Sequence, residues 1–365
     1  MQEIRYPYDK HPEPGQTKEL APGVRWLTMP MGGSLSHINL YLLEDDTGWY
    51  VVDTGLATQA VRDLWHQVFD TQLDGKPVIG VICTHFHPDH TGQAGMITDH
   101  FKCKFYMTRG EYYQARAFSG GPSSHHSSWH GLQFYTRADM PDDFISQLST
   151  MWQNRASEGM SMQEMPTGFH ALRHGDELEI GGRTWRVAVG RGHSPEHACL
   201  YCAELRILIS GDQILPIITS NVSVHPTEPE ANPLNLWMRS LDAFLSTPDD
   251  TFVLPAHNLP FFGVRTRLRD LMNHHEDRLL AIEEACVEPQ TARQLLPVLF
   301  SRKLDPRQMM MATGEAIAHL HLLMHRSRIE RTLGEDGRYW FRSTDPNLSQ
   351  RSHPHAGPSE EPQLV

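Results

Sequence analysis

The sequence has few cysteines and no long apolar stretch. Its 365 residues include five Cys, a sparse and odd number that indicates no disulfide framework and predicts a reducing, cytoplasmic location. No run of about eighteen apolar residues occurs, so no membrane-spanning helix is expected. The first residues, MQEIRYPYDKHPEPG, contain no apolar segment of the kind found in secretory signals, so none is expected here.

Basic residues are also scarce relative to acidic ones. The chain carries 32 Lys and Arg against 44 Asp and Glu, a net charge of −12. A protein that coats nucleic acid is normally basic, so this balance favours a small-molecule substrate over a nucleic-acid partner. Hydrophobic residues make up 39% of the chain, enough for a real core, and the 23 His direct attention to metal ligands.

Short β-rich runs alternate with helical spacing through the first two thirds of the chain. The predicted strands are Val24–Met29, Asn39–Leu43, Trp49–Val52, Val78–Cys83, Glu177–Ile180, Thr184–Val189, Ala198–Cys202 and Ile207–Ile209, with a helix at Ala60–Phe69. This alternation indicates a layered α/β domain. The segment 108–167 is richer in Met, Gln, Ser and His, and is interpreted as an insertion or lid, with a plain helical decoration as the alternative.

A second unit is expected after Phe262. Three helices, Val264–Val287, Thr291–Phe300 and Gln308–Arg326, precede a hairpin at Arg328–Arg342. Three helices followed by a hairpin are the outline of a winged helix, so the predicted domains are 1–262, 263–342 and a disordered tail at 343–365.

The segment from Thr84 to Gly92, THFHPDHTG, directly follows the predicted strand Val78–Cys83. His85 and His87 alternate in the strand sense, so they can face one way, and Pro88 turns the chain. Imidazole and carboxylate are ligand types that suit Zn²⁺, Fe²⁺ or Mn²⁺. The spacing HxHxDH therefore predicts a metal site.

At this point the sequence resembles the metallo-β-lactamase fold hydrolases, which carry HxHxDH after a strand. Three further positions match that pattern: His193 in GHSPEH, Asp212 in SGD and His257 in LPAH. The resemblance implies an αββα sandwich with a small C-terminal winged-helix domain. It also implies two divalent ions, one held by His85, His87 and His193 and the other by Asp89, His90 and His257, with Asp212 bridging them.

The resemblance also implies a chemistry. Two divalent ions roughly 3.5–4 Å apart lower the pKa of a shared water to about 7 and polarise a carbonyl or phosphoryl oxygen. Asp89 is expected to orient the resulting hydroxide and pass on its proton. Asp53, in the VVDTG segment, is expected to fix a ligand rather than to bind metal. Zinc is the first expectation, with iron or manganese as alternatives.

The expected function is hydrolysis of a small ester, thioester or lactone. Asp212 is present and no Cys falls at a ligand position, so the pattern resembles the dinuclear, glyoxalase-II-like branch more than dedicated β-lactamases. An endoribonuclease or other phosphodiesterase is the first alternative. A non-catalytic binding protein that kept the fold is the second, and the intact ligand set argues against it. A homodimer is a further expectation about partners.

Several other residues have weaker signals. His225, His37 and Tyr112 are candidate substrate contacts, with packing as the alternative. The Cys199–Cys202 pair forms a C-x-x-C, but it lies in a predicted strand, where positions i and i+3 point to opposite faces. Solvent-facing positions are expected for His274 and His275, and solvent-facing positions or contacts to a metal ligand are expected for His125, His126 and His130.

Overall fold

The structure is a computed structural model, and it describes residues 3–33, 35–119, 129–157, 164–301, 303–345 and 348. His125, His126, the side chain of His130 and most of the predicted tail 343–365 lie outside the described residues, as does part of the predicted insertion 108–167.

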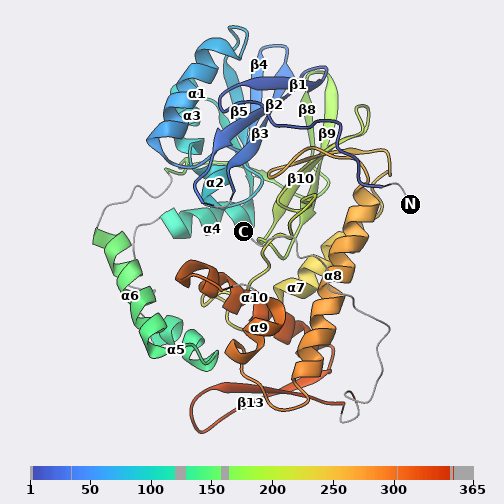
Figure 1. Cartoon of the computed structure of the whole chain (residues 1–365). Helices are drawn as coiled ribbons and strands as arrows, with labels where there is room; N and C mark the ends of the chain where they lie inside the picture. Colours follow the sequence, from blue (N-terminus) through green and yellow to red (C-terminus); the bar gives the residue numbers. More distant parts are fainter. Residues whose placement is uncertain are drawn as a thin grey trace.

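Two β-sheets form the centre of the part of the molecule that lies in the upper half of Figure 1. The first sheet has seven strands in the order of the chain: β1 (Thr17–Ala21), β2 (Val24–Pro30), β3 (His37–Asp45), β4 (Gly48–Val52), β5 (Val78–Ile82), β6 (Lys104–Thr108) and β7 (His170–Leu172). The second has five strands in the order β12 (Phe252–Pro255), β11 (Ile207–Gly211), β10 (His197–Cys202), β9 (Arg183–Gly190) and β8 (Glu177–Ile180). Pairing changes from antiparallel to parallel at β4 in the first sheet and at β11 in the second.

Alternation along β3 shows how the sheets become buried on both faces. Leu40 and Leu42 pack with the helices outside the first sheet, whereas Tyr41 and Leu43 pack with the second sheet. Successive side chains of a strand point to opposite faces, so a nearly continuous apolar run is what a doubly covered strand requires. The expected αββα sandwich is thereby confirmed.

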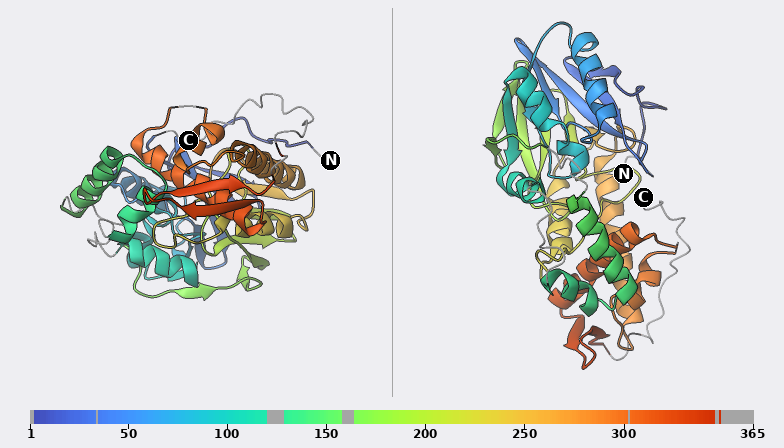
Figure 2. Two further views of the ribbon diagram at one scale, coloured as in Figure 1. Left: turned by 90° about the horizontal axis from the view of Figure 1, so that it is seen from below. Right: turned by 90° about the vertical axis from the view of Figure 1, so that its left-hand side faces the viewer.

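Helices cover the outer face of each sheet. The first sheet is covered by α1 (Gln59–Thr71), α3 (Ala94–Phe101) and α4 (Arg109–Ser119), with the short α2 (Pro88–Thr91) at its edge. The second sheet is covered by α7 (Pro233–Phe244) and the first half of α8 (Val264–Ala285). Figure 2 shows these layers from two further sides.

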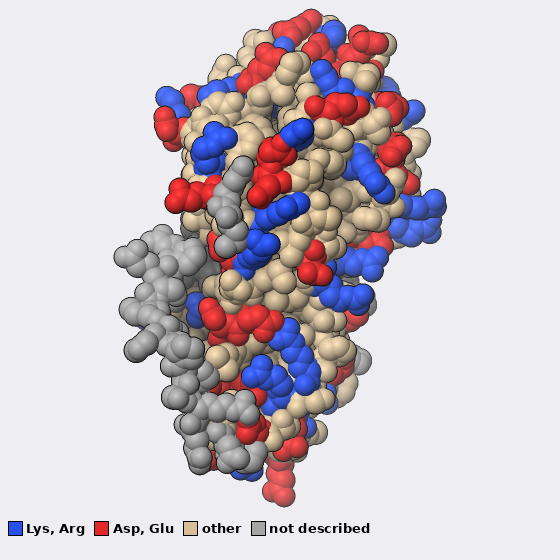
Figure 3. All heavy atoms as spheres, turned by 90° about the vertical axis from the view of Figure 1, so that its right-hand side faces the viewer, with Lys and Arg blue, Asp and Glu red and all other residues tan. Residues whose placement is uncertain are grey.

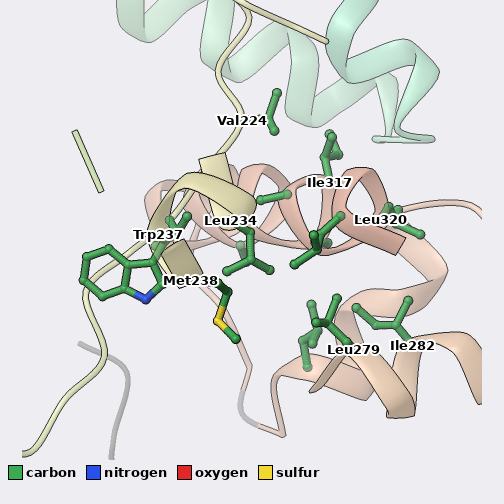
Figure 4. Close-up of a cluster of buried hydrophobic side chains, with 14 of the residues drawn as sticks. Val224, Leu234, Trp237, Met238, Leu279, Ile282, Ile317 and Leu320 are labelled. Atoms are coloured by element: carbon green, nitrogen blue, oxygen red, sulfur yellow. The ribbon is translucent and has the colours of Figure 1, made fainter. Parts of the chain in front are cut away.

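The C-terminal elements follow the predicted order. After α8, the chain forms a short 3₁₀ turn (Arg293–Leu295), α9 (Leu296–Leu299) and α10 (Pro306–His325). A hairpin of β13 (Ile329–Leu333) and β14 (Tyr339–Ser343) follows α10. Leu234 and Trp237 of α7, Leu279 and Ile282 of α8, and Ile317 of α10 belong to one buried cluster (Figure 4). The C-terminal helices are therefore packed through α7 and α8 onto the second sheet.

Two further helices flank this C-terminal unit. They are α5 (Trp129–Arg137) and α6 (Asp142–Ser157), both inside the segment 108–167. The Arg293 amide donates to the Ala138 carbonyl (3.1 Å) and the Thr291 hydroxyl to Asp139 (3.0 Å). Much of this segment's described part therefore packs on the C-terminal helices.

One expectation about α8 is wrong. His275 was expected to face solvent, yet only 1% of its surface is exposed, and its Nδ1 lies 3.3 Å from Nε2 of His319 on α10. Because α8 is packed between α7 and α10, it buries a wider face than an amphipathic surface helix. Local periodicity could not indicate this, since the second partner comes from a distant part of the chain.

Candidate metal centre

The side chains that match the ligand pattern all follow strand ends at one edge of the two sheets. His85, His87, Asp89 and His90 follow β5, and His193 follows β9. Asp212 and His257 directly follow the parallel strands β11 and β12. Parallel strands place their carboxyl ends at the same edge, so residues far apart in sequence are brought together there by the sheets.

These side chains form two groups with converging ligand atoms. One group contains His85, His87, His193 and Asp212, and the other contains Asp89, His90 and His257, with the ligand atoms of each group within 4.8 Å of one another. Asp212 reaches both, because its Oδ2 lies 3.4 Å from Nε2 of His193 and its Oδ1 lies 3.4 Å from Nε2 of His257.

The donor atoms of these groups fit a cation. Nε2 of His90 and Oδ1 of Asp212 are buried without a hydrogen-bond partner in the described part of the chain. Nε2 of His90 lies 3.4 Å from Asp89 and 3.6 Å from Asp212, beyond normal hydrogen-bond length. Buried, unpaired lone pairs that point at one another are costly unless an ion satisfies them.

Charge supports the same conclusion. Burial alone would lower the pKa of His90, but Asp53, Asp89 and Asp212 outweigh it and raise that pKa well above its ordinary value. Burial likewise would raise the pKa of Asp89, yet His90 and His257 hold it below its usual range. The carboxylates therefore remain ionised and attract positive charge to this point.

Two imidazoles of the first group, those of His85 and His87, are held neutral. Burial, followed by repulsion from His90, His87 and His197, lowers the pKa of His85 well below its ordinary value. Burial and repulsion from His193 lower the pKa of His87 to about 3. Neutral imidazole is the form that binds metal ions.

Two of the candidate histidine ligands, His90 and His193, are oriented by a contact to their other ring nitrogen. Asp53 Oδ2 accepts from Nδ1 of His90 (2.8 Å), while its Oδ1 accepts from the Thr84 amide (2.8 Å). The Asn221 carbonyl accepts from Nδ1 of His193 (2.7 Å). Such contacts fix the tautomer and leave Nε2 free for a metal ion. Asp53 thus holds the ring of a candidate ligand in place and is not one of the residues whose donor atoms converge.

Two residues of the site were missed by the sequence reasoning. Glu111 of α4 is fully buried, and its carboxylate accepts hydrogen bonds from the Phe86 amide (2.9 Å), the Ser194 hydroxyl (2.7 Å) and the Glu196 amide (2.6 Å). It therefore ties the two ligand-bearing loops together. Burial, only partly offset by these hydrogen bonds, raises its pKa to about 7. No local spacing distinguishes this glutamate from others on helices.

His197 is the second missed residue. It accepts a hydrogen bond from the Asp212 amide on Nε2 (3.0 Å), and its ring stacks on His85 at 4.7 Å between centroids. Gly211 has a φ of +49°, and a Cβ there would lie 2.6 Å from the His197 ring. A glycine before Asp212 is thus required for this close approach. The signal available in the sequence was a second histidine in GHSPEH.

The weaker candidates occupy different surroundings. His225 is an exposed residue, and desolvation followed by repulsion from His193 lowers its pKa. The His37 carbonyl lies 3.3 Å from Nδ1 of His257. Tyr112, by contrast, stacks on Phe169 at 3.9 Å and donates to the Pro166 carbonyl (2.9 Å). Its burial in the core of the first sheet favours the packing interpretation over contact with a substrate.

The fold and the site define a metal-dependent hydrolase. Comparison with known proteins identifies the family to which it belongs. The family model of the metallo-beta-lactamase superfamily matches residues 33–257, and that of the metallo-beta-lactamase-like C-terminal domain matches residues 279–344. The chain belongs to the metallo-beta-lactamase superfamily.

Individual relatives agree with this placement. A beta-lactamase domain protein from Burkholderia ambifaria has a crystal structure that is 41% identical, covers 93% of this chain and 98% of its own, and superposes with a TM-score of 0.85. The probable metallo-hydrolase YqjP of Bacillus subtilis is 24% identical over 81% of this chain and 91% of its own length. The human acyl-coenzyme A thioesterase MBLAC2 is 25% identical over 54% of this chain and 65% of its own length.

Within the described residues, none of the helices combines the length and apolar character needed to cross a membrane. On the face shown in Figure 3, basic and acidic side chains are intermingled over the described residues.

Proposed function

We propose that this chain is a dinuclear metallo-hydrolase that cleaves acyl thioesters or related small esters and lactones. The observation that carries the proposal is the position of Asp212, whose two carboxylate oxygens reach one histidine of each ligand group at 3.4 Å. A carboxylate in that position can bridge two ions. The thioesterase name of the MBLAC2 relative supports an acyl thioester as the substrate.

The ligand assignment follows the two groups. His85, His87 and His193 would hold one ion and Asp89, His90 and His257 the other, with Asp212 shared. Nitrogen and carboxylate donors suit Zn²⁺ first, and Fe²⁺ or Mn²⁺ as alternatives. When bound, such ions supply Lewis acidity, which activates water and polarises the scissile carbonyl.

The remaining residues of the centre hold the ligands in position, and one of them can accept a proton. Asp53, the Asn221 carbonyl and the His37 carbonyl hold the rings of His90, His193 and His257 in place. Asp89 Oδ2 lies 3.4 Å from Nε2 of both His90 and His257, so this oxygen would bind the ion. The carboxylate is ionised, and its other oxygen, Oδ1, would accept the proton of the attacking water. Glu111 keeps the two ligand loops at a constant separation.

The test is turnover of the metal-loaded protein on a panel of an acyl thioester, a lactone, a simple ester, a cephalosporin and single-stranded RNA. We expect metal-dependent cleavage of the thioester by the wild type and no cleavage by the Asp212→Ala variant. The inactive variant would exclude a contaminating hydrolase as the source of the activity. Cleavage of RNA alone would contradict the proposal and favour the endoribonuclease alternative. Retention of two ions and full activity by Asp212→Ala would contradict the dinuclear assignment.

A further inference from the structure

A cavity of about 720 Å³ lies between α4, α5 and the C-terminal unit. This volume is in the range of small-molecule sites, roughly 300–1,000 Å³. Its apolar wall includes Ala117 and Phe118 of α4, Phe134 of α5, Ile317 of α10 and Phe341 of β14. Elements from both parts of the chain thus enclose a largely apolar space.

Two walls of the cavity are connected along the chain to the candidate metal centre. On one side, α4 carries Glu111, which contacts both ligand loops, and further along it Phe118, whose ring stacks on Phe86 at 5.5 Å between centroids. On the other side, the segment that begins with Asn221, the partner of His193, reaches the cavity at Pro226 and Glu230. Two segments that contact the candidate ligand loops therefore also line the cavity.

The polar end of the cavity carries a surplus of positive charge. Arg331 is paired with Glu230 through two contacts of 3.3 and 2.9 Å, so these charges offset each other. Arg137 forms no ion pair with any described carboxylate, and its guanidinium lies 4.9 Å from the centroid of the Tyr339 ring. Tyr339 also contacts Arg331 at 4.2 Å. Arg137 is thus a pre-positioned cation at a largely apolar cavity.

We propose that this cavity binds the non-reacting part of the substrate, an apolar body that carries a negatively charged group, and that Arg137 binds that group. The catalytic part of this inference rests on the proposed function. The negative group can belong to the leaving thiol, as the phosphates of coenzyme A do, or to the far end of the acyl chain. Both sources present the same chemistry to a guanidinium.

Binding can be tested without turnover by a matched pair of fluorescent probes. 8-Anilinonaphthalene-1-sulfonate and N-phenyl-1-naphthylamine share an apolar body, and only the first carries a negative charge. We expect Arg137→Gln to weaken binding of the sulfonate about tenfold or more, the loss of one charge-assisted contact, and to leave the neutral probe within about twofold. Ala117→Trp, which fills the cavity, should weaken both probes.

Matched controls keep the test specific. Arg342→Gln changes an exposed arginine on β14, the strand that carries Tyr339, and Ala60→Trp changes an exposed alanine of α1. Neither residue lines the cavity, so neither variant should affect either probe. The proposal is overturned if Arg137→Gln and Ala117→Trp bind both probes like the wild type, or if the controls weaken binding equally.

Kinetics then identify the source of the charge. Hexanoyl-N-acetylcysteamine is neutral, hexanoyl-coenzyme A carries its charge on the thiol, and adipoyl-N-acetylcysteamine carries it on the acyl end. Arg137→Gln should raise KM about tenfold for one of the two charged thioesters, with kcat and the neutral thioester little changed. An equal change in all three contradicts the inference. If the wild type cleaves none of them, the proposed function fails, and the probe titrations still decide the cavity.

Discussion

Two clusters of buried histidines lie in different parts of this molecule, and only one of them is a candidate metal centre. The imidazoles at the sheet edge converge with Asp89 and Asp212. His275 and His319 lie between α8 and α10, where Nδ1 of His319 donates to the Glu315 carbonyl (2.8 Å) and its Nε2 lies 3.3 Å from Nδ1 of His275. Burial lowers the pKa of both members of this second pair.

Buried neutral histidine is therefore not a sufficient sign of a metal site. Neutral imidazoles occur in both clusters. Among the residues that the structure describes, groups of three or more converging ligand atoms that include a carboxylate oxygen occur only at the sheet edge. Without a carboxylate the pair in the helical unit gains nothing from a bound cation, whereas the sheet edge carries negative charge that a cation neutralises.

The largest expected effect comes from removing the shared carboxylate of the first cluster. Asp212→Asn should reduce the metal content to one ion or fewer per chain and lower turnover to background, because both groups lose a charged ligand. Metal analysis and hydrolysis assays check this. Asp242→Asn on α7, an exposed position, is the matched control and should change neither value. Two bound ions in the Asp212→Asn protein would contradict the conclusion that the carboxylates distinguish the sheet edge from the second cluster.

A smaller effect is expected from the carboxylate that orients a ligand. Asp53→Asn keeps the shape but removes the charge that holds Nδ1 of His90 at 2.8 Å. Loss of such an orienting contact typically costs about 10- to 100-fold in metal affinity or activity. Metal titration of the variant measures it, and a loss as complete as that of Asp212→Asn would mean that Asp53 is itself a ligand.

The second cluster should affect stability rather than metal binding. Burial lowers the pKa of His319 to about 4, so the unfolded chain takes up more protons than the folded one once the pH falls below about 6.5. The free energy of unfolding should therefore fall between pH 6.5 and 4, and His319 alone accounts for about 2 kcal/mol of this fall at pH 5.

Denaturant unfolding at pH 7 and pH 5 tests that expectation. His319→Leu should show a smaller fall than the wild type by about this amount and retain its full metal content at pH 7. An unchanged pH dependence would show that this pair does not contribute, and lost metal would show that the two clusters are coupled.

The smallest effect is expected at the C-x-x-C of β10. Cys199 packs with the helices outside the second sheet, whereas Cys202 packs between the sheets. The prediction that these thiols point to opposite faces is confirmed, so they cannot chelate one ion. Cys199→Ala and Cys202→Ala should each leave the metal content unchanged. A stoichiometric loss of metal in both variants would show a thiolate site.

Much of the site could be predicted from the sequence because its signals are local. HxHxDH places four potential ligands within six residues after an apolar run, and His193, Asp212 and His257 each follow a strand end. Glu111 could not be predicted, since its function depends on three hydrogen-bond donors from other segments. The burial of His275 was missed for the same reason, because its partner His319 is on another helix.

The sequence by itself determined the ligand types, the strands that end at them and the alternation that buries both faces of the sheets, because these depend on residue type and on the two-residue period of a strand. Only the tertiary structure decided that Asp212 faces both ligand groups, that Tyr112 packs in the core, and that Arg137 meets an apolar cavity between α4, α5 and the C-terminal unit. These relations depend on how distant segments pack, and packing is a property of the whole chain rather than of any local pattern.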